Sequence, residues 1–146
     1  MDNFKKYFLR DKKIYLENIS YETVENGTPK LPVRRLGCKD TVIAQLFLPT
    51  GVKIIFNRRL SFEPEALFTL SVSFGAFFRF NPEYYEEVDW QQVNIVQEFT
   101  KNYPDLLSEL TSRTTLLVAQ ITSASGGTPL ITAVPNIPKT KNESEI

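Results

Sequence analysis

Residues Ala66 to Phe80 read ALFTLSVSFGAFFRF, and this stretch decides the fold class. From Phe68 to Ala76, apolar residues alternate with Thr, Ser and Gly. Successive side chains of a β-strand point to opposite faces of a sheet, so this period of two predicts a strand with one apolar face and one face of small, polar residues. The apolar face needs a second layer to cover it.

The pattern changes after Gly75, where the chain continues as Ala-Phe-Phe-Arg-Phe. Three aromatic residues here exceed what a strand with one solvent-facing side should carry. Glycine within a strand often marks a bulge, so one interpretation is a bulge or a strand end buried on both faces. The alternative is an adhesive aromatic surface, and both interpretations stay open at this point.

Three more strands are predicted on the N-terminal side of this one. Asp40–Leu48 and Val52–Leu60 are rich in β-forming residues, and the Pro49 and Gly51 between them fit a tight turn. These two segments therefore predict a hairpin. Lys13–Tyr21 alternates in the same way and predicts the first strand.

The C-terminal half predicts a long helix over Asp89–Ser125 that is interrupted near Pro104. Asp89 and Gln92 have the spacing of a capping box, which marks a helix start, and a proline breaks a helix interior. Beyond the proline, leucine and isoleucine recur at helical spacing and form one stripe: Leu106, Leu110, Leu117 and Ile121. We expect this stripe, or its polar flank, to form an oligomer interface.

Together these elements predict an α+β fold, a four-stranded antiparallel sheet with a long, Pro-interrupted helix packed on one face. The 146 residues are enough for one hydrophobic core and too few for two ordinary ones. Residues 1–138 are therefore expected to form a single domain. The polar residues 139–146 are expected to form a disordered C-terminal tail.

The composition limits the possible partners. Hydrophobic residues make up 42% of the chain and aromatic residues 12%, which is typical of a folded protein. The 17 Lys and Arg residues balance 17 Asp and Glu residues, so no net field attracts nucleic acid or an anionic membrane, and neither partner is expected. The apolar runs are shorter than a membrane span and no signal-peptide core is found, which predicts a cytoplasmic protein.

The residue types also argue against catalysis. The chain contains no histidine and one cysteine, Cys38, so it cannot form an internal disulfide, a Ser-His-Asp triad or a His-ligated metal site. The carboxylates between Glu63 and Asp89 could form an acidic pair, but their spacing is that of a solvated surface. Cys38 is interpreted as a small buried apolar residue. We therefore expect no enzymatic activity, no metal and no cofactor.

Several segments resemble SecB, the bacterial protein-export chaperone family. The first strand, Tyr15–Glu22, is similar to the opening strand of SecB, and Phe74–Phe77 is similar to the end of its fourth strand. Tyr103–Leu107 matches the Pro-containing start of the family's long helix, and Gly127–Ile137 matches the segment that follows it. The resemblance covers residues 13 to 137 in the same order. Two departures are a longer helix after the proline and the absence of the family's C-terminal helix.

The resemblance implies an ATP-independent holding chaperone that binds unfolded or nascent polypeptides and assembles as a tetramer, a dimer of dimers. The family's motor ATPase, SecA, docks on acidic positions of the sheet. Glu22 matches one of these positions, whereas Asn18 replaces another and Leu70 provides an apolar residue near a third. The sequence therefore resembles the chaperone body more than the adaptor for export.

The candidate client-binding residues are aromatic and concentrate after Gly75. Ordinary core packing is the alternative explanation for each of them singly, but as a cluster they exceed what a small monomer can bury. The candidates are Phe62, Phe77, Phe78, Phe80, Tyr84, Tyr85 and Trp90. Two other functions stay open: a chaperone dedicated to one partner, such as an antitoxin, and a small-ligand carrier or enzyme with an apolar pocket.

Overall fold

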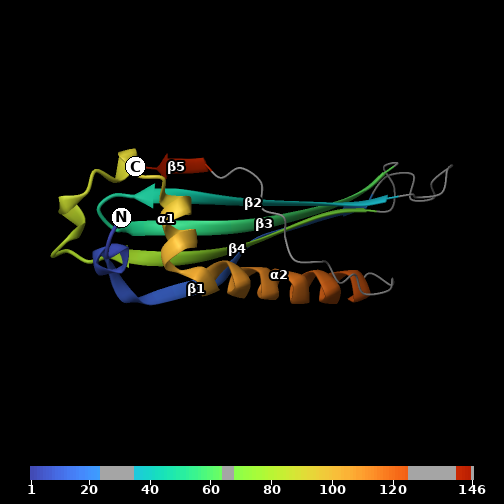
Figure 1. Ribbon diagram of the computed structural model, residues 1–146. Coiled ribbons are helices and arrows are strands. Elements are labelled where there is room, and N and C mark those ends of the chain that lie inside the picture. Colours follow the sequence, from blue (N-terminus) through green and yellow to red (C-terminus); the bar gives the residue numbers. More distant parts are fainter. Residues whose placement is uncertain (24–34, 64–67, 125–140, 146) are drawn as a thin grey trace.

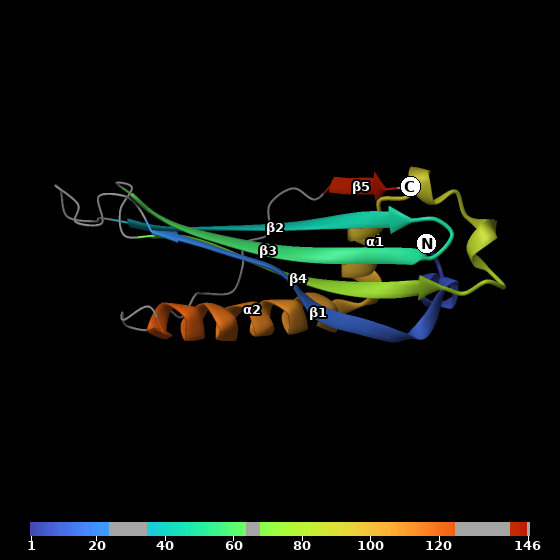
Figure 2. The same ribbon diagram turned by 180° about the vertical axis from the view of Figure 1, so that it is seen from behind.

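The computed structural model describes residues 1–23, 35–63, 68–124 and 141–145, which form one sheet with helices on one face (Figures 1 and 2). The strand order is β1-β4-β3-β2-β5. The strands are β1 (Phe8–Thr23), β2 (Arg35–Phe47), β3 (Gly51–Glu63), β4 (Phe68–Phe80) and β5 (Lys141–Glu145). The first four strands pair in antiparallel fashion, which confirms the predicted four-stranded sheet.

The predicted hairpin joins β2 and β3. Its turn closes at the pair Phe47 and Gly51, and the Thr50 N–H donates a hydrogen bond to the Phe47 carbonyl over 2.6 Å. The turn position needs a glycine because a Cβ at Gly51 would collide with the carbonyl oxygen of Phe78 on the neighbouring strand. The turn therefore fixes the register of β3 against both neighbours.

Gly75 does not mark a bulge, because the pairing of β3 with β4 runs through it without a shift. The Tyr15 ring of β1 covers the space over this glycine, and a Cβ on Gly75 would lie 3.1 Å from that ring. The alternation continues beyond it, so Phe78 and Phe80 are buried while Arg79 is exposed. The interpretation as a bulge or as a strand end buried on both faces is therefore wrong, because only the face that carries Phe78 and Phe80 is buried at this end.

The helical layer begins later than predicted. The helix α1 (Ile95–Asn102) starts after Asn94, whose side chain accepts a hydrogen bond from the Gln97 N–H over 3.2 Å. Asp89 precedes a short 3₁₀ turn, η3 (Trp90–Gln92), and its side chain caps nothing. The interruption at the proline is confirmed, because α2 (Pro104–Ala124) begins there. In Figure 1, α1 crosses the strands and α2 runs along them.

Every fourth residue of α2 is buried against the sheet: Leu106, Leu110, Thr114, Val118 and Thr122. The two threonine hydroxyls donate hydrogen bonds to helix carbonyls one turn earlier, each over 2.8 Å, so no polar group is left unsatisfied there. Two of the predicted interface residues, Leu106 and Leu110, thus face the protein's own core. Leu117 and Ile121 lie partly buried beside this line.

A buried ion pair lies between the sheet and α2. The Arg58 side chain is 0% exposed, and its Nε donates to Asp40 Oδ1 over 2.8 Å while a terminal nitrogen donates to Asp40 Oδ2 over 3.1 Å. Another terminal nitrogen donates to the Thr115 hydroxyl over 3.1 Å. Arg58 therefore links β2, β3 and α2, and bidentate geometry of this kind is what a buried charge requires.

The sheet gains a fifth strand from the C-terminal residues. β5 pairs in parallel with the outer edge of β2, with Ile43 opposite Lys141 and Phe47 opposite Glu145. The sequence predicts a disordered tail over 139–146, and the structure differs for residues 141–145, because an open strand edge offers backbone partners to any extended segment. The segment Gly127–Ile137 lies outside the described residues. Within those ranges, no helix combines the length and the apolar character that crossing a bilayer requires.

Candidate functional site

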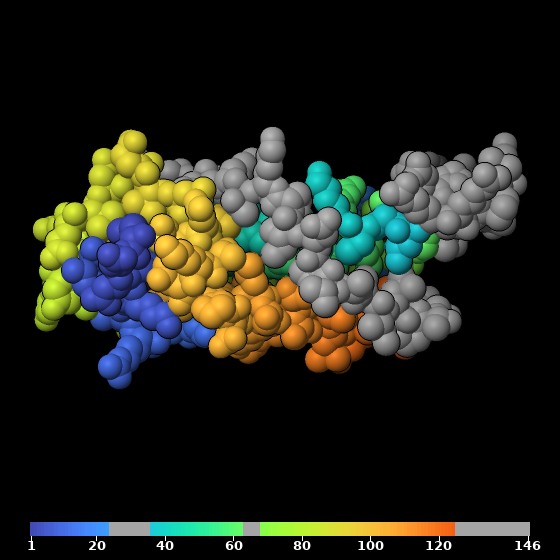
Figure 3. Space-filling model, in the orientation of Figure 1, coloured from blue at the N-terminus to red at the C-terminus, as the bar shows by residue number. Residues whose placement is uncertain are grey.

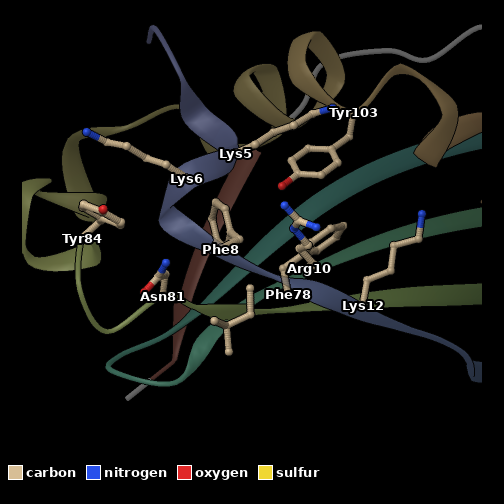
Figure 4. Close-up of a pocket in the computed structure, with 10 residues that line it drawn as sticks. Lys5, Lys6, Phe8, Arg10, Lys12, Phe78, Asn81, Tyr84 and Tyr103 are labelled. Atoms are coloured by element: carbon tan, nitrogen blue, oxygen red, sulfur yellow. The ribbon is translucent and has the colours of Figure 1, made fainter.

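An open cavity of about 670 Å³ lies at one end of the sheet (Figure 4). It forms where the N-terminal segment, with η1 (Phe4–Tyr7) and the start of β1, meets the end of β4 and the junction between α1 and α2. Figure 3 shows the N-terminal residues packed beside α1 at this end of the molecule. The cavity thus depends on segments that are about a hundred residues apart in the sequence.

The floor of the cavity is aromatic. Phe8 and Phe78 line it and are only 5% and 2% exposed, with their ring centroids 6.1 Å apart. Tyr103 forms one wall, with its ring centroid 5.0 Å from that of Phe78. Behind these rings lies Phe99 of α1, whose centroid is 4.7 to 5.1 Å from those of Phe8, Phe78 and Tyr103. Such tilted and stacked contacts hold the floor in one shape.

Backbone hydrogen bonds hold the segments that bring the floor together. The Asn81 N–H donates to the Tyr7 carbonyl over 2.8 Å, which ties the end of β4 to η1. The Tyr103 N–H donates to the Phe99 carbonyl, also over 2.8 Å, and so closes α1 just before Pro104. The proline at the start of α2 therefore places the Tyr103 ring over the cavity.

The rim of the cavity is basic, with the four cations Lys5, Lys6, Arg10 and Lys12 (Figure 4). Lys6 Nζ lies 3.3 Å from a Glu87 carboxylate oxygen and Lys12 Nζ lies 3.4 Å from one of Glu109. The hydrogen bond to Glu87 raises the pKa of Lys6. Burial raises the pKa of Tyr103, so its phenol is neutral at physiological pH.

The cavity has the groups to bind an apolar side chain. Among the described residues that line it, there is no Asp, Glu or Cys. Elsewhere in the described ranges, no group of three His, Cys, Asp or Glu side chains is placed to hold a metal ion. The chemistry at this site is therefore apolar burial bordered by positive charge.

The structure brings two of the seven candidate client-binding residues, Phe78 and Tyr84, to this cavity. Phe80 and Trp90 are 4% and 3% exposed and pack against each other behind it, with centroids 4.9 Å apart. Tyr85 is half-buried, stacks on Phe80 at 5.2 Å and accepts the indole N–H of Trp90 on its carbonyl oxygen over 2.8 Å. These three residues support the site from within the protein.

The other two candidates lie elsewhere. Phe77 points to the opposite face of β4 and lines a separate hollow of about 410 Å³ with Asp11, Lys13 and Arg79. Phe62 packs against Phe68 near the far end of the sheet, with ring centroids 5.1 Å apart. Glu22, the candidate docking residue, is exposed on β1.

The sequence reasoning missed Phe8, Tyr103 and the four rim cations. A signal was present, since Phe4 to Lys13 reads FKKYFLRDKK and interleaves aromatic with basic residues. That interleaving is typical of a binding surface. Cys38 is exposed rather than buried, which contradicts its interpretation as a buried apolar residue. It lies near the start of β2, where its thiol donates a weak hydrogen bond to Asp40 Oδ1 over 3.8 Å.

Comparison with solved structures reveals a likeness that comparison of sequences does not. No protein-family model matches the sequence, and a search of curated proteins found no match. Among solved structures, the chain is similar to the SecB-like chaperone Rv1957 of Mycobacterium tuberculosis, in complex with a ChAD peptide from the Rv1956 HigA1 antitoxin. The two chains share 15% sequence identity, the TM-score is 0.54, and the match covers 90% of each chain. This chain therefore has the SecB-like fold, with a four-stranded antiparallel sheet carrying helices on one face.

Proposed function

We propose that this protein is an ATP-independent holding chaperone that binds unfolded polypeptide in the cavity lined by Phe8, Phe78 and Tyr103. The observation that carries this proposal is a preformed aromatic floor that opens to solvent within a SecB-like fold. An apolar side chain of a client would replace water over that floor, and the floor would need no rearrangement to receive it. Preformed sites bind with less loss of entropy than flexible ones.

The energetics of one cavity favour weak, general binding. Burying about 150 Å² of a client's aromatic side chain, at about 25 cal/mol per Å², contributes roughly 4 kcal/mol before the cost of ordering the client. A single site therefore holds a client only briefly. Several sites on one assembly, binding one chain together, raise the affinity and lower the concentration of aggregation-prone molecules by mass action.

The proposal includes a homo-oligomer, for which the family resemblance implies a tetramer. Within the described residues, β1 has one unpaired edge, and it carries the exposed apolar residues Leu16, Ile19 and Tyr21. Leu116 on the outer side of α2 is 62% exposed. Subunit contacts over these residues, or over the partly buried Leu117 and Ile121, would cover apolar surface that the protomer leaves open.

A second candidate is a chaperone dedicated to one partner, and the likeness to Rv1957 favours it because that protein was solved with an antitoxin peptide. A toxin and antitoxin pair encoded beside this gene would support that alternative. An export role has little support, since Glu22 is the one acid that matches the SecA-docking positions and Leu70 is 1% exposed. A small-ligand carrier fits the cavity volume, but among the described lining residues there is no carboxylate to orient a cationic ligand.

The test is suppression of aggregation by the purified protein without nucleotide, measured by light scattering on several chemically unfolded substrates. The variant L9S/Y84S removes two partly exposed cavity residues, and L36S is a control that removes an apolar residue exposed outside the cavity. We expect the parent and the control to protect the substrates and the cavity variant to lose most of its protection.

Two outcomes would contradict the proposal. If the cavity variant keeps its melting temperature and oligomeric mass and still protects as well as the parent, clients bind elsewhere. If the parent protects none of the substrates, the general chaperone is excluded and the dedicated chaperone becomes the better account.

A further inference from the structure

We infer that the cavity selects polypeptide segments in which a large apolar side chain is flanked by Asp or Glu. This inference rests on the proposed function and names the chemistry of the partner. Its basis is that two of the four rim cations form ion pairs with described residues, whereas the other two do not.

The rim carries more positive charge than the protein itself neutralises. Lys6 and Lys12 have carboxylate partners, Glu87 and Glu109, and Glu109 is also 3.4 Å from Arg113. Lys5 and Arg10 form no ion pair with any residue in the described ranges. Two cations at the mouth are therefore available to a carboxylate from outside.

These two cations lie beside Tyr103 in the lining of the cavity. The Lys5 ammonium lies 5.2 Å from the centre of the Tyr103 ring, and Figure 4 shows the Arg10 side chain pointing toward the same tyrosine. Both charges thus border the space above Phe8 and Phe78. In an extended peptide every second side chain points to the same face, about 6.6 Å further along the chain, so a carboxylate two residues from a seated apolar residue can reach this edge.

The chemistry of the two cations suits a carboxylate. An arginine guanidinium can bind both oxygens of a carboxylate, which adds geometric selectivity to the attraction. Tyr103 adds no negative charge, because its phenol stays protonated. A Lys or Arg beside the seated residue would instead face like charges, so a basic segment should bind less well than a neutral one.

The surroundings favour a peptide over a membrane or a nucleic acid. The whole chain has a formal net charge of zero, and two of the four rim cations are already paired, so the positive region is local. The floor is recessed, with Phe8 and Phe78 nearly buried, so a flat lipid surface cannot reach it. An extended peptide can place one side chain into such a cavity and its flanking carboxylates on the rim.

The experiment uses three fluorescent peptides that share a Leu-Phe-Leu centre and differ in flanks of Glu, Gln or Lys, with binding followed by anisotropy on the full chain. We expect affinity to fall in that order, with roughly a five- to tenfold difference between the Glu and Lys peptides at low salt. Added salt should remove this difference and leave the Gln peptide unchanged. The variant K5E/R10E should reverse the order.

The matched control is K39E/R59E. Lys39 and Arg59 are exposed and pair across β2 and β3, and the control changes the same number of charges as the cavity variant. Val52 pairs with Phe78 at the cavity, and Arg59 is seven residues further along β3, or about 23 Å away. The control should keep the order of the parent, and melting curves should show that both variants are folded.

The outcomes separate this inference from the proposed function. Equal affinity for the three peptides, or the same order in K5E/R10E as in the parent, overturns the inference and leaves the chaperone proposal standing. No binding of any peptide, together with no protection of unfolded substrates, overturns the proposed function itself. Displacement of the Glu peptide by phosphatidylglycerol vesicles, with no displacement by neutral vesicles, would replace the acidic peptide by a membrane surface.

Discussion

The two ends of the sheet differ in how far the protomer buries their apolar side chains. At the cavity end, η1, α1 and the residues after β4 enclose Phe4, Phe99 and Trp90, each at most 3% exposed. At the far end, Ile19 and Tyr21 pair with Val72 and Leu70 and so share the helix-covered face, yet they are 41% and 36% exposed. The protomer encloses its apolar residues at one end and leaves Ile19 and Tyr21 partly exposed at the other.

The difference follows from which helix covers which strands. α1 crosses the strands at the cavity end, whereas α2 runs along them and packs on β3 and β4 (Figure 1). Strand β1, at the sheet edge, stays outside this cover along its second half. The protomer buries most of the predicted aromatic cluster by itself, since Phe78, Phe80 and Trp90 are at most 4% exposed, so the expectation that this cluster exceeds what a monomer can bury is wrong.

The largest effect is expected from breaking the cavity end with Phe99→Ala. Phe99 contacts the rings of Phe4, Phe8, Phe78 and Tyr103, so its loss leaves a void beneath the floor. We expect the free energy of unfolding to fall by about 4 kcal/mol in urea titration. Phe99→Leu, which fills most of the space, should cost less than half of that. Equal losses for the two variants would contradict the packing described for this end.

Breaking the ion pair under α2 should have the next largest effect. Arg58→Ala leaves the Asp40 carboxylate buried without its charge partner, and we expect a loss of about 3 kcal/mol in the free energy of unfolding. The double variant D40L/R58M removes both charges and should be more stable than the single variant. If the single variant loses less than about 1 kcal/mol, Arg58 does not hold α2 to the sheet.

The far end should respond in mass rather than in stability. Ile19→Ser with Tyr21→Ser removes side chains that are 41% and 36% exposed, and Tyr21 stacks on Phe68, so the protomer's free energy of unfolding should fall by only about 1 to 2 kcal/mol. The molar mass by light scattering should fall below that of the parent, because the proposed subunit contact is lost. An unchanged oligomeric mass would show that β1 is not part of the interface.

The smallest effect on stability is expected from removing the ion pair between Lys6 and Glu87 at the cavity rim. Lys6 and Glu87 form an ion pair between exposed side chains, so Lys6→Gln should shift the melting temperature by no more than about 1 °C. The folded protein raises the pKa of Lys6 above 10.5, so any contribution is complete at lower pH and disappears as the pH rises through that pKa. A large shift at pH 7 would mean that the rim holds η1 in place.

The sequence predicts the sheet well because its signals are local. The alternation from Phe68 to Ala76 and the turn at Pro49 and Gly51 each lie within a few residues, and both are confirmed. The predicted helix start at Asp89 is wrong, because Asp89 and Asn94 are both residue types that cap helices. In the structure Asn94 caps the helix, whereas Asp89 precedes the short turn that contains Trp90.

The site is harder to predict because it depends on contacts between distant segments. Phe78 and Tyr84 belong to the aromatic cluster that the sequence singles out, but Phe8 and Tyr103 join them only when η1 meets the junction of α1 and α2. Aromatic density alone does not separate residues that line a cavity from residues that support it, as Phe80 and Trp90 show.

The central claim, that unfolded polypeptide lies in the cavity, is tested most directly by site-specific photo-crosslinking. A benzophenone amino acid replaces Leu9, which lines the cavity, or Leu116, which is 62% exposed on α2. Each protein is irradiated without nucleotide in the presence of an unfolded substrate, and the products are identified by mass spectrometry. We predict strong crosslinks from position 9 and few from position 116. Crosslinks of equal yield from both positions, or from position 116 alone, would contradict the account.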